Sequence, residues 1–491
     1  MSRWNLGWLV GVTAAAILGI SITYSAPPAQ KKHQNLKLVV DVLDEVQKRY
    51  VKELDQDQMR KLVENMVNGG LEKLDPHSGF MGAEDYKQFK QQTRGKFGGV
   101  GIRLNVDPRT GHFLVESPIA GSPAYDAGIL PGDVILKVDG KSIETWELKQ
   151  VVESIQGDKD TDVTLTILHE GEKSPVDLKM KRAEIKIESV MGDTRKKLNL
   201  KEWDFWIDPE SKIAFVRVQQ FTETTTEELT RVVDALQKSN MKGLIVDLRD
   251  NPGGLLTSAV EVSSLFIPEG KTVVTTKGRD SVDAVLSAKI KGNMKAGTNY
   301  PIAILLNRYS ASASEIVAAA LQDHARAILV GERSYGKGSV QNLIDMEGGQ
   351  TALKLTTASY WRPNGRNIHR FPDSKEADDW GVKPDKNYEV KLTDEERREY
   401  YKWRRERDIL RRPGQEVKLP AEGDNKGKKE FRDRVVDKAL EYLRAEIAKD
   451  GQRDAQAPMP LNHRAAQVVP ASIERNAIAE VADRTYRNIV R

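Results

Sequence analysis

The stretch Gly243-Leu-Ile-Val-Asp-Leu-Arg-Asp-Asn-Pro-Gly-Gly254 decides the fold of the central part of this chain. Its short, continuous apolar run is typical of a strand buried on both faces of a parallel sheet. A glycine-rich turn follows, and then a pattern that predicts a helix from Leu255 to Phe266. Free backbone N–H groups at such a turn make it a candidate oxyanion site. The alternatives are a plain tight turn and a phosphate-binding loop, but no Gly-Lys-Ser follows it.

Strands and helices alternate on both sides of this stretch. Further apolar runs begin at Ile213, Ile302 and Ala327, and helical patterns cover 226–238 and 313–323. Alternation of this kind predicts an α/β core, which we assign to residues 183–390.

The strand beginning at Ile302 enters its helix through the serine-rich stretch Ser310-Ala-Ser-Ala-Ser314. Small neighbours allow a substrate carbonyl to reach a serine at a helix N-terminus. The alternative is that one of these serines simply caps the helix.

A lysine between two glycines follows the next strand, in the segment Val330-Gly-Glu-Arg-Ser-Tyr-Gly-Lys-Gly-Ser-Val-Gln341. If Lys337 is buried there, its charged form is disfavoured and its pKa falls. A neutral lysine can act as a general base. The alternative is an ordinary lysine in a surface turn.

Residues 95–182 change character, with short β-branched runs separated by Gly, Pro and Asp. The block Ser122-Pro-Ala-Tyr-Asp-Ala-Gly-Ile-Leu-Pro-Gly-Asp-Val-Ile-Leu-Lys-Val-Asp-Gly140 resembles a bacterial PDZ domain, and Phe97-Gly-Gly-Val-Gly-Ile102 fits its carboxylate-binding loop. This resemblance implies that a ligand C-terminus adds as a strand. We expect the contacts at Gly99, Val100, Gly101 and Ile102, with a helix at 147–155 as the other wall.

The motifs together resemble the C-terminal processing peptidases, over roughly residues 36–390. Two further blocks fit that family: Leu71-x-x-Leu-Asp-Pro-His-Ser78 and Gly381-Val-Lys-Pro-Asp385. The segment between Asn367 and Gly381 is longer and more charged than we expect of the family.

The resemblance implies a multidomain α/β protein with an inserted PDZ domain and a crotonase-like ββα protease core. It implies a serine endopeptidase that needs no metal or cofactor and takes protein or peptide substrates with exposed C-termini. Carried over by position, the site residues are the nucleophile Ser312, the general base Lys337, Gln341 to orient the lysine, and the oxyanion N–H groups of Gly254 and Ala313.

Composition excludes several other classes of protein. The chain has 491 residues, with 76 Lys and Arg against 72 Asp and Glu, which is too balanced for a dedicated nucleic-acid binder. Cysteine is absent, so disulfides, cysteine nucleophiles and cysteine-ligated metals are excluded. None of the seven histidines forms a His-Glu-x-x-His pair.

The two ends of the chain predict export and assembly. Residues 1–30 carry Arg3 and then a long uncharged stretch, which indicates a signal peptide or a retained membrane anchor. The body is then extracytoplasmic, and we expect the periplasm. Residues 31–94 and 391–450 read as helical regions, and 451–491 as a flexible tail. Apolar stripes near both ends predict a homodimer, unless these helices pack onto their own core.

Other functions compete with this hypothesis. The Ser-x-x-Lys pairs at Ser334–Lys337 and Ser239–Lys242 lack the helical context and the Lys-Thr-Gly of penicillin-binding proteins. His324 lies too far along its predicted helix to serve Ser312. The remaining alternatives are a catalytically silent PDZ scaffold that binds C-termini, and a purely structural assembly protein.

Overall fold

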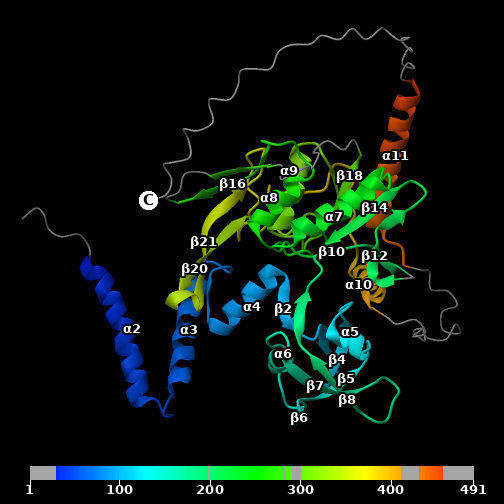
Figure 1. The fold of residues 1–491 in the computed structure, drawn as a ribbon. Helices are drawn as coiled ribbons and strands as arrows, with labels where there is room; N and C mark the ends of the chain where they lie inside the picture. Colours follow the sequence, from blue (N-terminus) through cyan, green and yellow to red (C-terminus); the bar gives the residue numbers. More distant parts are fainter. Residues whose placement is uncertain (1–28, 197–198, 280–283, 290–299, 411–430, 457–491) are drawn as a thin grey trace, which may run out of the picture.

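The computed structural model describes residues 29–196, 199–279, 284–289, 300–410 and 431–456 (Figure 1). The predicted signal or anchor at 1–30 and the predicted tail at 451–491 lie mostly outside these ranges. No helix among the described residues is long and apolar enough to cross a membrane. The described chain is a multidomain α/β structure with helices at both ends, as the sequence predicts.

The core sheet is mixed, with a parallel centre. Its order is β10 (Val190–Met191), β14 (Ile213–Val218), β15 (Gly243–Asp247), β18 (Ile302–Leu306) and β19 (Ile328–Gly331), and β13 (Trp206–Asp208) also pairs with β14. The last four strands of that order run parallel. Every residue of β14, β15 and β18 is buried, which explains their continuous apolar runs.

Helices cover both faces of this sheet. One face packs against α7 (Thr225–Lys238), α8 (Leu256–Ser264) and α9 (Ala313–Asp323). The other face packs against α11 (Arg434–Gln456), through the buried Val435, Ala439 and Leu443. The apolar stripe near the C-terminus is therefore used by the protein's own core, which corrects the expectation that it needs a partner. Helix α11 also continues past the predicted boundary at residue 450.

A second sheet carries the hairpin that follows Lys337. It contains β1 (Gly79–Met81), β21 (Thr351–Trp361), β16 (Thr272–Gly278) and β17 (Ala284–Ser287), in that order, and β20 (Ser339–Met346) pairs antiparallel with β21. A 3₁₀ turn at Glu347–Gly349 joins the two hairpin strands. Strand β1 belongs to the N-terminal region, so this sheet joins that region to the core.

The PDZ-like domain is a separate β-rich unit. Its sheet runs β3 (Ile102–Val106), β4 (Phe113–Pro118), β5 (Val134–Val138), β7 (Asp162–Leu168) and β8 (Val176–Lys181), with β6 (Lys141–Ser142) on β5. Helices α5 (Pro123–Ala127) and α6 (Leu148–Ile155) complete it, and β2 (Lys96–Gly99) pairs with β9 (Ala183–Lys186) at its base. Strand β3 lies at an edge of the sheet, where an added strand can pair.

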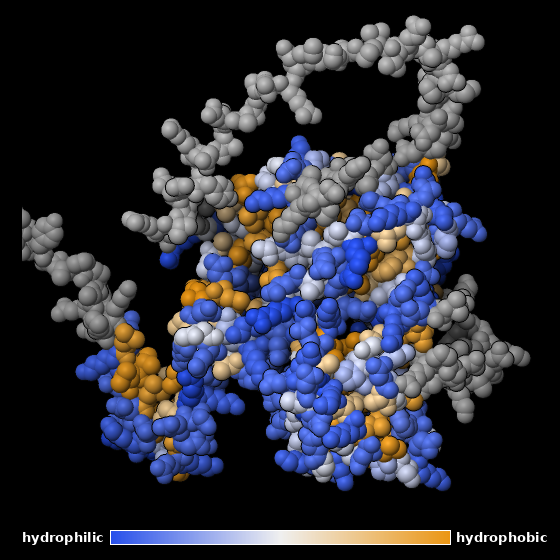
Figure 2. All heavy atoms as spheres, in the orientation of Figure 1, coloured by the Kyte–Doolittle hydropathy of each residue, from blue (hydrophilic) through white to orange (hydrophobic). Residues whose placement is uncertain are grey.

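In the part of the chain that the structure describes, three helices precede the PDZ-like domain: α2 (Ala29–Arg49), α3 (Gln56–Glu72) and α4 (Ala83–Arg94). Helix α3 contacts the hairpin tip through the Arg60–Glu347 ion pair. Helix α2 stands away from the body (Figure 1), and apolar side chains gather on it (Figure 2). Those with large exposed fractions are Leu36, Leu38, Val39, Val40 and Val42.

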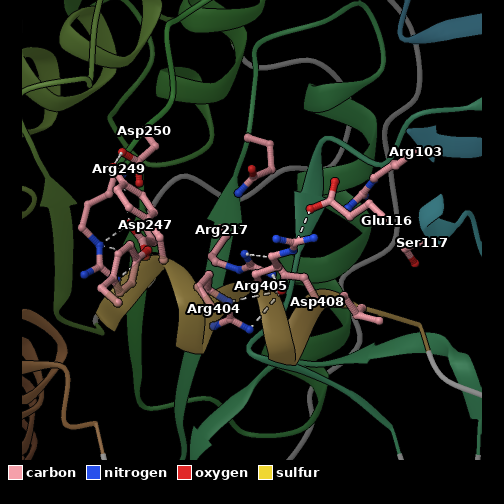
Figure 3. Close-up of a pocket in the computed structure, with 14 residues that line it drawn as sticks. Arg103, Glu116, Ser117, Arg217, Asp247, Arg249, Asp250, Arg404, Arg405 and Asp408 are labelled. Atoms are coloured by element: carbon pink, nitrogen blue, oxygen red, sulfur yellow. Dashed lines mark hydrogen bonds and ion pairs between the residues drawn. The ribbon is translucent and has the colours of Figure 1, made fainter. Parts of the chain in front are cut away.

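Helix α10 (Asp394–Asp408) joins the PDZ-like domain to the core. Arg405 of α10 pairs with Glu116 of the PDZ-like domain at 3.1 Å, and Asp408 accepts two hydrogen bonds from Arg217 of β14 (Figure 3). A cavity of about 350 Å³ lies among these charged groups. The small hairpin of β11 (Thr194–Lys196) and β12 (Asn199–Asp204) lies nearby, because Asp193 pairs with Arg404 of α10.

Candidate active site

Ser312 differs from the two serines beside it. Ser310 and Ser314 are fully buried, and their hydroxyls donate to the carbonyls of Leu248 and Asn251 at 2.8 and 2.9 Å. Ser312 is 8% exposed and stands at the N-cap of α9. Its φ of +56° lies in the left-handed region, which is strained for a residue with a side chain. Strain at such a position persists only where the surroundings fix it.

Glu315 supplies that fixing contact. Its buried carboxylate accepts the N–H of Ser312 at 2.7 Å and the N–H of Lys337 at 2.9 Å, both on Oε2. The N–H of Gly336 and the hydroxyl of Ser334 donate to Oε1 at 2.7 and 2.5 Å. Burial raises the pKa of Glu315 to about 7, against these four hydrogen bonds, which favour the anion. One carboxylate therefore joins the serine turn to the lysine loop.

Lys337 lies in a tightly packed loop. A Cβ on Gly336 would come within 2.8 Å of the Arg370 Cβ, and one on Gly338 within 2.3 Å of the His369 nitrogen. Only glycine fits at either position, so the lysine loop lies directly against the segment 367–381. Burial lowers the pKa of Lys337 and the charge of Lys354 lowers it further, whereas Glu315 and Asp75 raise it. The net direction is downward, which favours the neutral amine.

The glycine turn after β15 lies beside the serine turn. A Cβ on Gly253 would come within 2.7 Å of the Ser312 Cβ and 2.8 Å of the Ala313 nitrogen. Within the described ranges, neither Gly254 nor Ala313 donates its backbone N–H to another residue. The structure thus brings the two N–H groups of the predicted oxyanion site into one region.

The hydroxyl of Ser312 and the amide of Gln341 face partners other than Lys337. The phenol of Tyr360 lies near Ser312, and burial raises its pKa to about 12. The Gln341 amide donates to the hydroxyls of Ser339 and Thr356 at 2.9 and 3.1 Å. Between described residues, no hydrogen bond joins the Lys337 amine to Ser312 or to Gln341. Orientation of Lys337 by Gln341 therefore stays a prediction.

The predicted carboxylate-binding loop of the PDZ-like domain has its carbonyls turned inward. Val100 accepts a hydrogen bond from the N–H of Ala124, and Gly101 accepts one from Ile119. Among described residues, neither Val100 nor Gly101 donates its own N–H to another backbone group. Gly101 has φ of +79°, and a Cβ there would come within 2.4 Å of the Ser122 Cβ, so glycine is required. Gly99 and Ile102 border the loop at the ends of β2 and β3.

Sequence reasoning missed two residues of this site. Glu315 carries a detectable signal, since Ser312-x-x-Glu315 has the spacing of a capping box. Tyr360 carries none, because only the pairing of β21 with β16 and β20 brings it to Ser312. His324, the weak alternative base, ends α9 and contacts the Thr272 carbonyl at 2.7 Å. In the described part of the chain, no cluster of His, Asp and Glu is arranged to hold a metal ion.

Comparison with known proteins matches peptidase family S41 over residues 212–387 and a PDZ domain over residues 114–168. The carboxy-terminal-processing protease of Bartonella bacilliformis is 36% identical over 83% of this chain and 90% of that protein. The carboxy-terminal processing protease CtpA of Bacillus subtilis is 35% identical over 67% of this chain and 65% of that one. A solved photosystem II D1 C-terminal processing protease aligns with a TM-score of 0.39, at 27% identity, over 71% of this chain and 86% of its own.

Glu315→Ala should separate stability from catalysis when it is compared with Glu228→Ala. Glu228 also accepts four hydrogen bonds, from Ser189, Val190 and Thr224. It lies beside β10, at the edge of the core sheet opposite to β19, which leads to the lysine loop. Both changes should lower the free energy of unfolding by about 1–3 kcal/mol, because buried donors lose their acceptor. Only Glu315→Ala should also lower kcat, measured well below the unfolding temperature. Equal kcat in the two variants would contradict the role given to Glu315.

Proposed function

Because the chain belongs to the S41 family of carboxy-terminal processing proteases, which are serine peptidases, we propose that Ser312 is its nucleophile and Lys337 its general base. The family predicted from the sequence is thereby confirmed. The substrates of a protease with a PDZ domain are proteins or peptides. The assignment of the individual residues rests on the geometry of the site.

The observation that carries this assignment is the shared carboxylate of Glu315. It binds the backbone N–H groups of Ser312 and Lys337 through one oxygen, so the two residues lie in one site although they come from different loops. Of the three neighbouring serines, only Ser312 does not donate its hydroxyl to a backbone carbonyl of a described residue. A lysine with a lowered pKa beside such a serine has the chemistry of a base and a nucleophile.

The proposed reaction passes through an acyl-enzyme. The Ser312 hydroxyl turns toward Lys337, whose neutral amine takes the hydroxyl proton while Oγ attacks the scissile carbonyl. The N–H groups of Gly254 and Ala313 hold the oxyanion. The lysine ammonium then gives its proton to the leaving amine. Water, deprotonated by the same lysine, releases the new C-terminus and restores Ser312.

The PDZ-like domain is proposed to capture the substrate C-terminus. The backbone N–H groups of Val100 and Gly101 have no described backbone acceptor, and the neighbouring β3 is an edge strand. A terminal carboxylate on these N–H groups would place the preceding substrate residues along β3, as an added strand.

Helix α2 supports the proposal of a homodimer. Five large apolar side chains between residues 36 and 42 are exposed, with Leu36 at 63% and Leu38 at 66%. They follow one another along the helix that stands away from the body, and a second copy offers a matching surface by symmetry. The dimer proposal now rests on α2 alone, since α11 packs on its own core.

Export to the periplasm is proposed on the sequence alone, from the long uncharged stretch after Arg3. The same stretch, if retained, would anchor the enzyme to the membrane. Separation of periplasmic, membrane and cytoplasmic fractions of cells that express the full chain checks this placement; recovery in the cytoplasm alone would contradict it.

Ser312→Ala should lower turnover of labelled casein by at least about a thousandfold, since it removes the nucleophile. Ser310→Ala and Ser314→Ala are the matched controls and should keep turnover close to that of the unchanged protein. Lys337→Ala and Lys337→Arg should both be inactive, because arginine stays charged at any working pH. If all these variants turn over casein equally, Ser312 and Lys337 are not the catalytic pair. If the unchanged protein itself does not turn over casein, the silent PDZ scaffold replaces the proposed enzyme.

The pH profile gives a second test of Lys337. Since only the neutral amine can accept the Ser312 proton, kcat/KM should rise with pH and level off above the lowered pKa of Lys337. The plateau should therefore begin at a lower pH than an ordinary lysine would allow. A flat profile from mildly acidic to alkaline pH would remove lysine as the base.

A pair of peptides that differ only at the C-terminus tests the PDZ proposal. The free acid should show a kcat/KM at least about tenfold above that of the C-terminal amide. The reason is that charge-assisted hydrogen bonds to the carboxylate are worth about 1.5–3 kcal/mol. Equal kcat/KM for the two peptides would mean that the loop with Val100 and Gly101 does not bind the carboxylate.

Light scattering on residues 31–491 tests the dimer. The unchanged protein should have the mass of two chains, and the double change Val39→Asp and Val42→Asp should yield single chains by charging the α2 surface. Leu74→Asp, at a position 71% exposed outside α2, is the control. A single-chain mass for the unchanged protein at micromolar concentration would refute the proposal.

A further inference from the structure

The block Asp75-Pro-His-Ser78 lies against the hairpin of β20 and β21, although it precedes Lys337 by more than two hundred residues in the sequence. It forms the turn between α3 and β1. Strand β1 pairs antiparallel with β21, with Gly79 opposite Lys354. The turn therefore sits where the N-terminal region meets the hairpin of β20 and β21.

Asp75 organises this turn and also reaches across to the hairpin. Its Oδ1 accepts the N–H groups of His77 and Ser78 at 2.8 and 2.9 Å, and its Oδ2 accepts the Ser78 hydroxyl at 2.6 Å. The hydroxyl of Thr356 on β21 donates to Oδ1 at 3.0 Å, and the N–H of Thr356 donates to the Ser78 hydroxyl at 3.0 Å. Two hydrogen bonds thus join the turn to one residue of the hairpin.

Thr356 is also the residue that holds Gln341. The two are paired across the hairpin, next to a register shift between Val340 and Gln341. The Gln341 amide donates to the Thr356 hydroxyl at 3.1 Å. A continuous chain of hydrogen bonds therefore runs from Asp75 through Thr356 to Gln341, four residues after Lys337 in the strand that its loop leads into.

We propose that Asp75 is a positioning residue for the general base: its carboxylate fixes Thr356 and Gln341 at the start of the hairpin, and its charge acts on the Lys337 amine. The proposal rests on the proposed function, in which Lys337 is the base. It gives the N-terminal region a direct part in the reaction, besides its part in assembly.

The charges around Lys337 make the effect of Asp75 measurable. Lys354 of β21 and Glu315 of α9 act on Lys337, and Asp75 is the other carboxylate that favours its charged form. His77 of the turn and His369 of the segment against Gly338 are the nearby histidines, and burial lowers the pKa of each. Tyr360 completes the surroundings with a raised pKa. Loss of the Asp75 charge should therefore lower the pKa of Lys337 further.

The N-terminal region has other contacts with the same hairpin, so Asp75 does not have to hold it alone. Arg60 of α3 pairs with Glu347 at the hairpin tip, and the Tyr86 hydroxyl of α4 donates to Asp345 at 2.6 Å. These contacts keep the hairpin in place when the Asp75 link is cut. A change at Asp75 should therefore alter the site rather than unfold it.

Asp75→Asn and Thr356→Val test the proposal by their kinetics on labelled casein across pH. Asp75→Asn should lower kcat by about 10- to 100-fold through misplacement of the base. It should also move the rising limb of kcat/KM to lower pH, because a negative charge near Lys337 is lost. Thr356→Val cuts the link to Gln341 without a change of charge, so kcat should fall while the limb stays in place. KM should change little in either variant.

Asp107→Asn is the matched control, because Asp107 makes the same kind of turn, with Arg109 and Thr110, in the PDZ-like domain. It should behave as the unchanged protein does. The proposal is overturned if the rising limb of the kcat/KM profile of Asp75→Asn stays at the same pH, or if its kcat equals that of the control. If Asp75→Asn does not fold, unchanged kcat in Thr356→Val overturns it. Activity retained by Lys337→Ala would instead refute the proposed function itself, so the two failures are distinct.

Discussion

The buried carboxylate of Glu315 is the contact on which the site depends. Taking a carboxylate out of water is costly unless hydrogen bonds replace its hydration. Here three backbone N–H groups and the Ser334 hydroxyl do so, and they come from the serine turn and from the lysine loop. The same contact holds Ser312 at a positive φ that a serine would not otherwise keep. The position of Ser312 and its strained backbone thus follow from contact with one buried carboxyl group.

The parallel sheet explains why this carboxylate can collect groups from separate segments. The glycine turn follows β15, the serine turn follows β18, and the lysine loop follows β19, and these are neighbouring strands. Carboxyl ends of adjacent parallel strands meet at one edge, where α/β proteins bind their ligands. The second sheet then closes over this edge, because its hairpin continues directly from the lysine loop.

The terminal regions support this arrangement from both sides. The turn at Asp75 contacts the hairpin, whereas α11 packs on the face of the core sheet opposite to α7, α8 and α9. Arg249, at the end of β15, is buried between Asp247 and Asp433, at 2.7 and 2.9 Å, and Asp433 directly precedes α11. Helix α10 in turn contacts the PDZ-like domain through Arg405 and Glu116. Contacts between side chains therefore connect that domain, through α10, to Arg249, whose guanidinium lies over the Tyr400 ring of α10.

The sequence by itself determined the local features of this protein. Continuous apolar runs specify buried parallel strands, and the helix over 313–323 is confirmed. The family followed from the order and spacing of short motifs, which a linear pattern records. Only the tertiary structure decided that Ser312, among the three serines, has a hydroxyl that is not bonded to a backbone carbonyl of a described residue. The hydroxyls of the other two serines donate to the carbonyls of Leu248 and Asn251. The roles of Glu315, Tyr360 and Asp75 likewise depend on contacts between distant segments, because burial and hydrogen-bond partners exist only once the sheets have paired. The exposed stripe of α2 and the buried stripe of α11 look alike as sequence, and only packing against the core sheet distinguishes them.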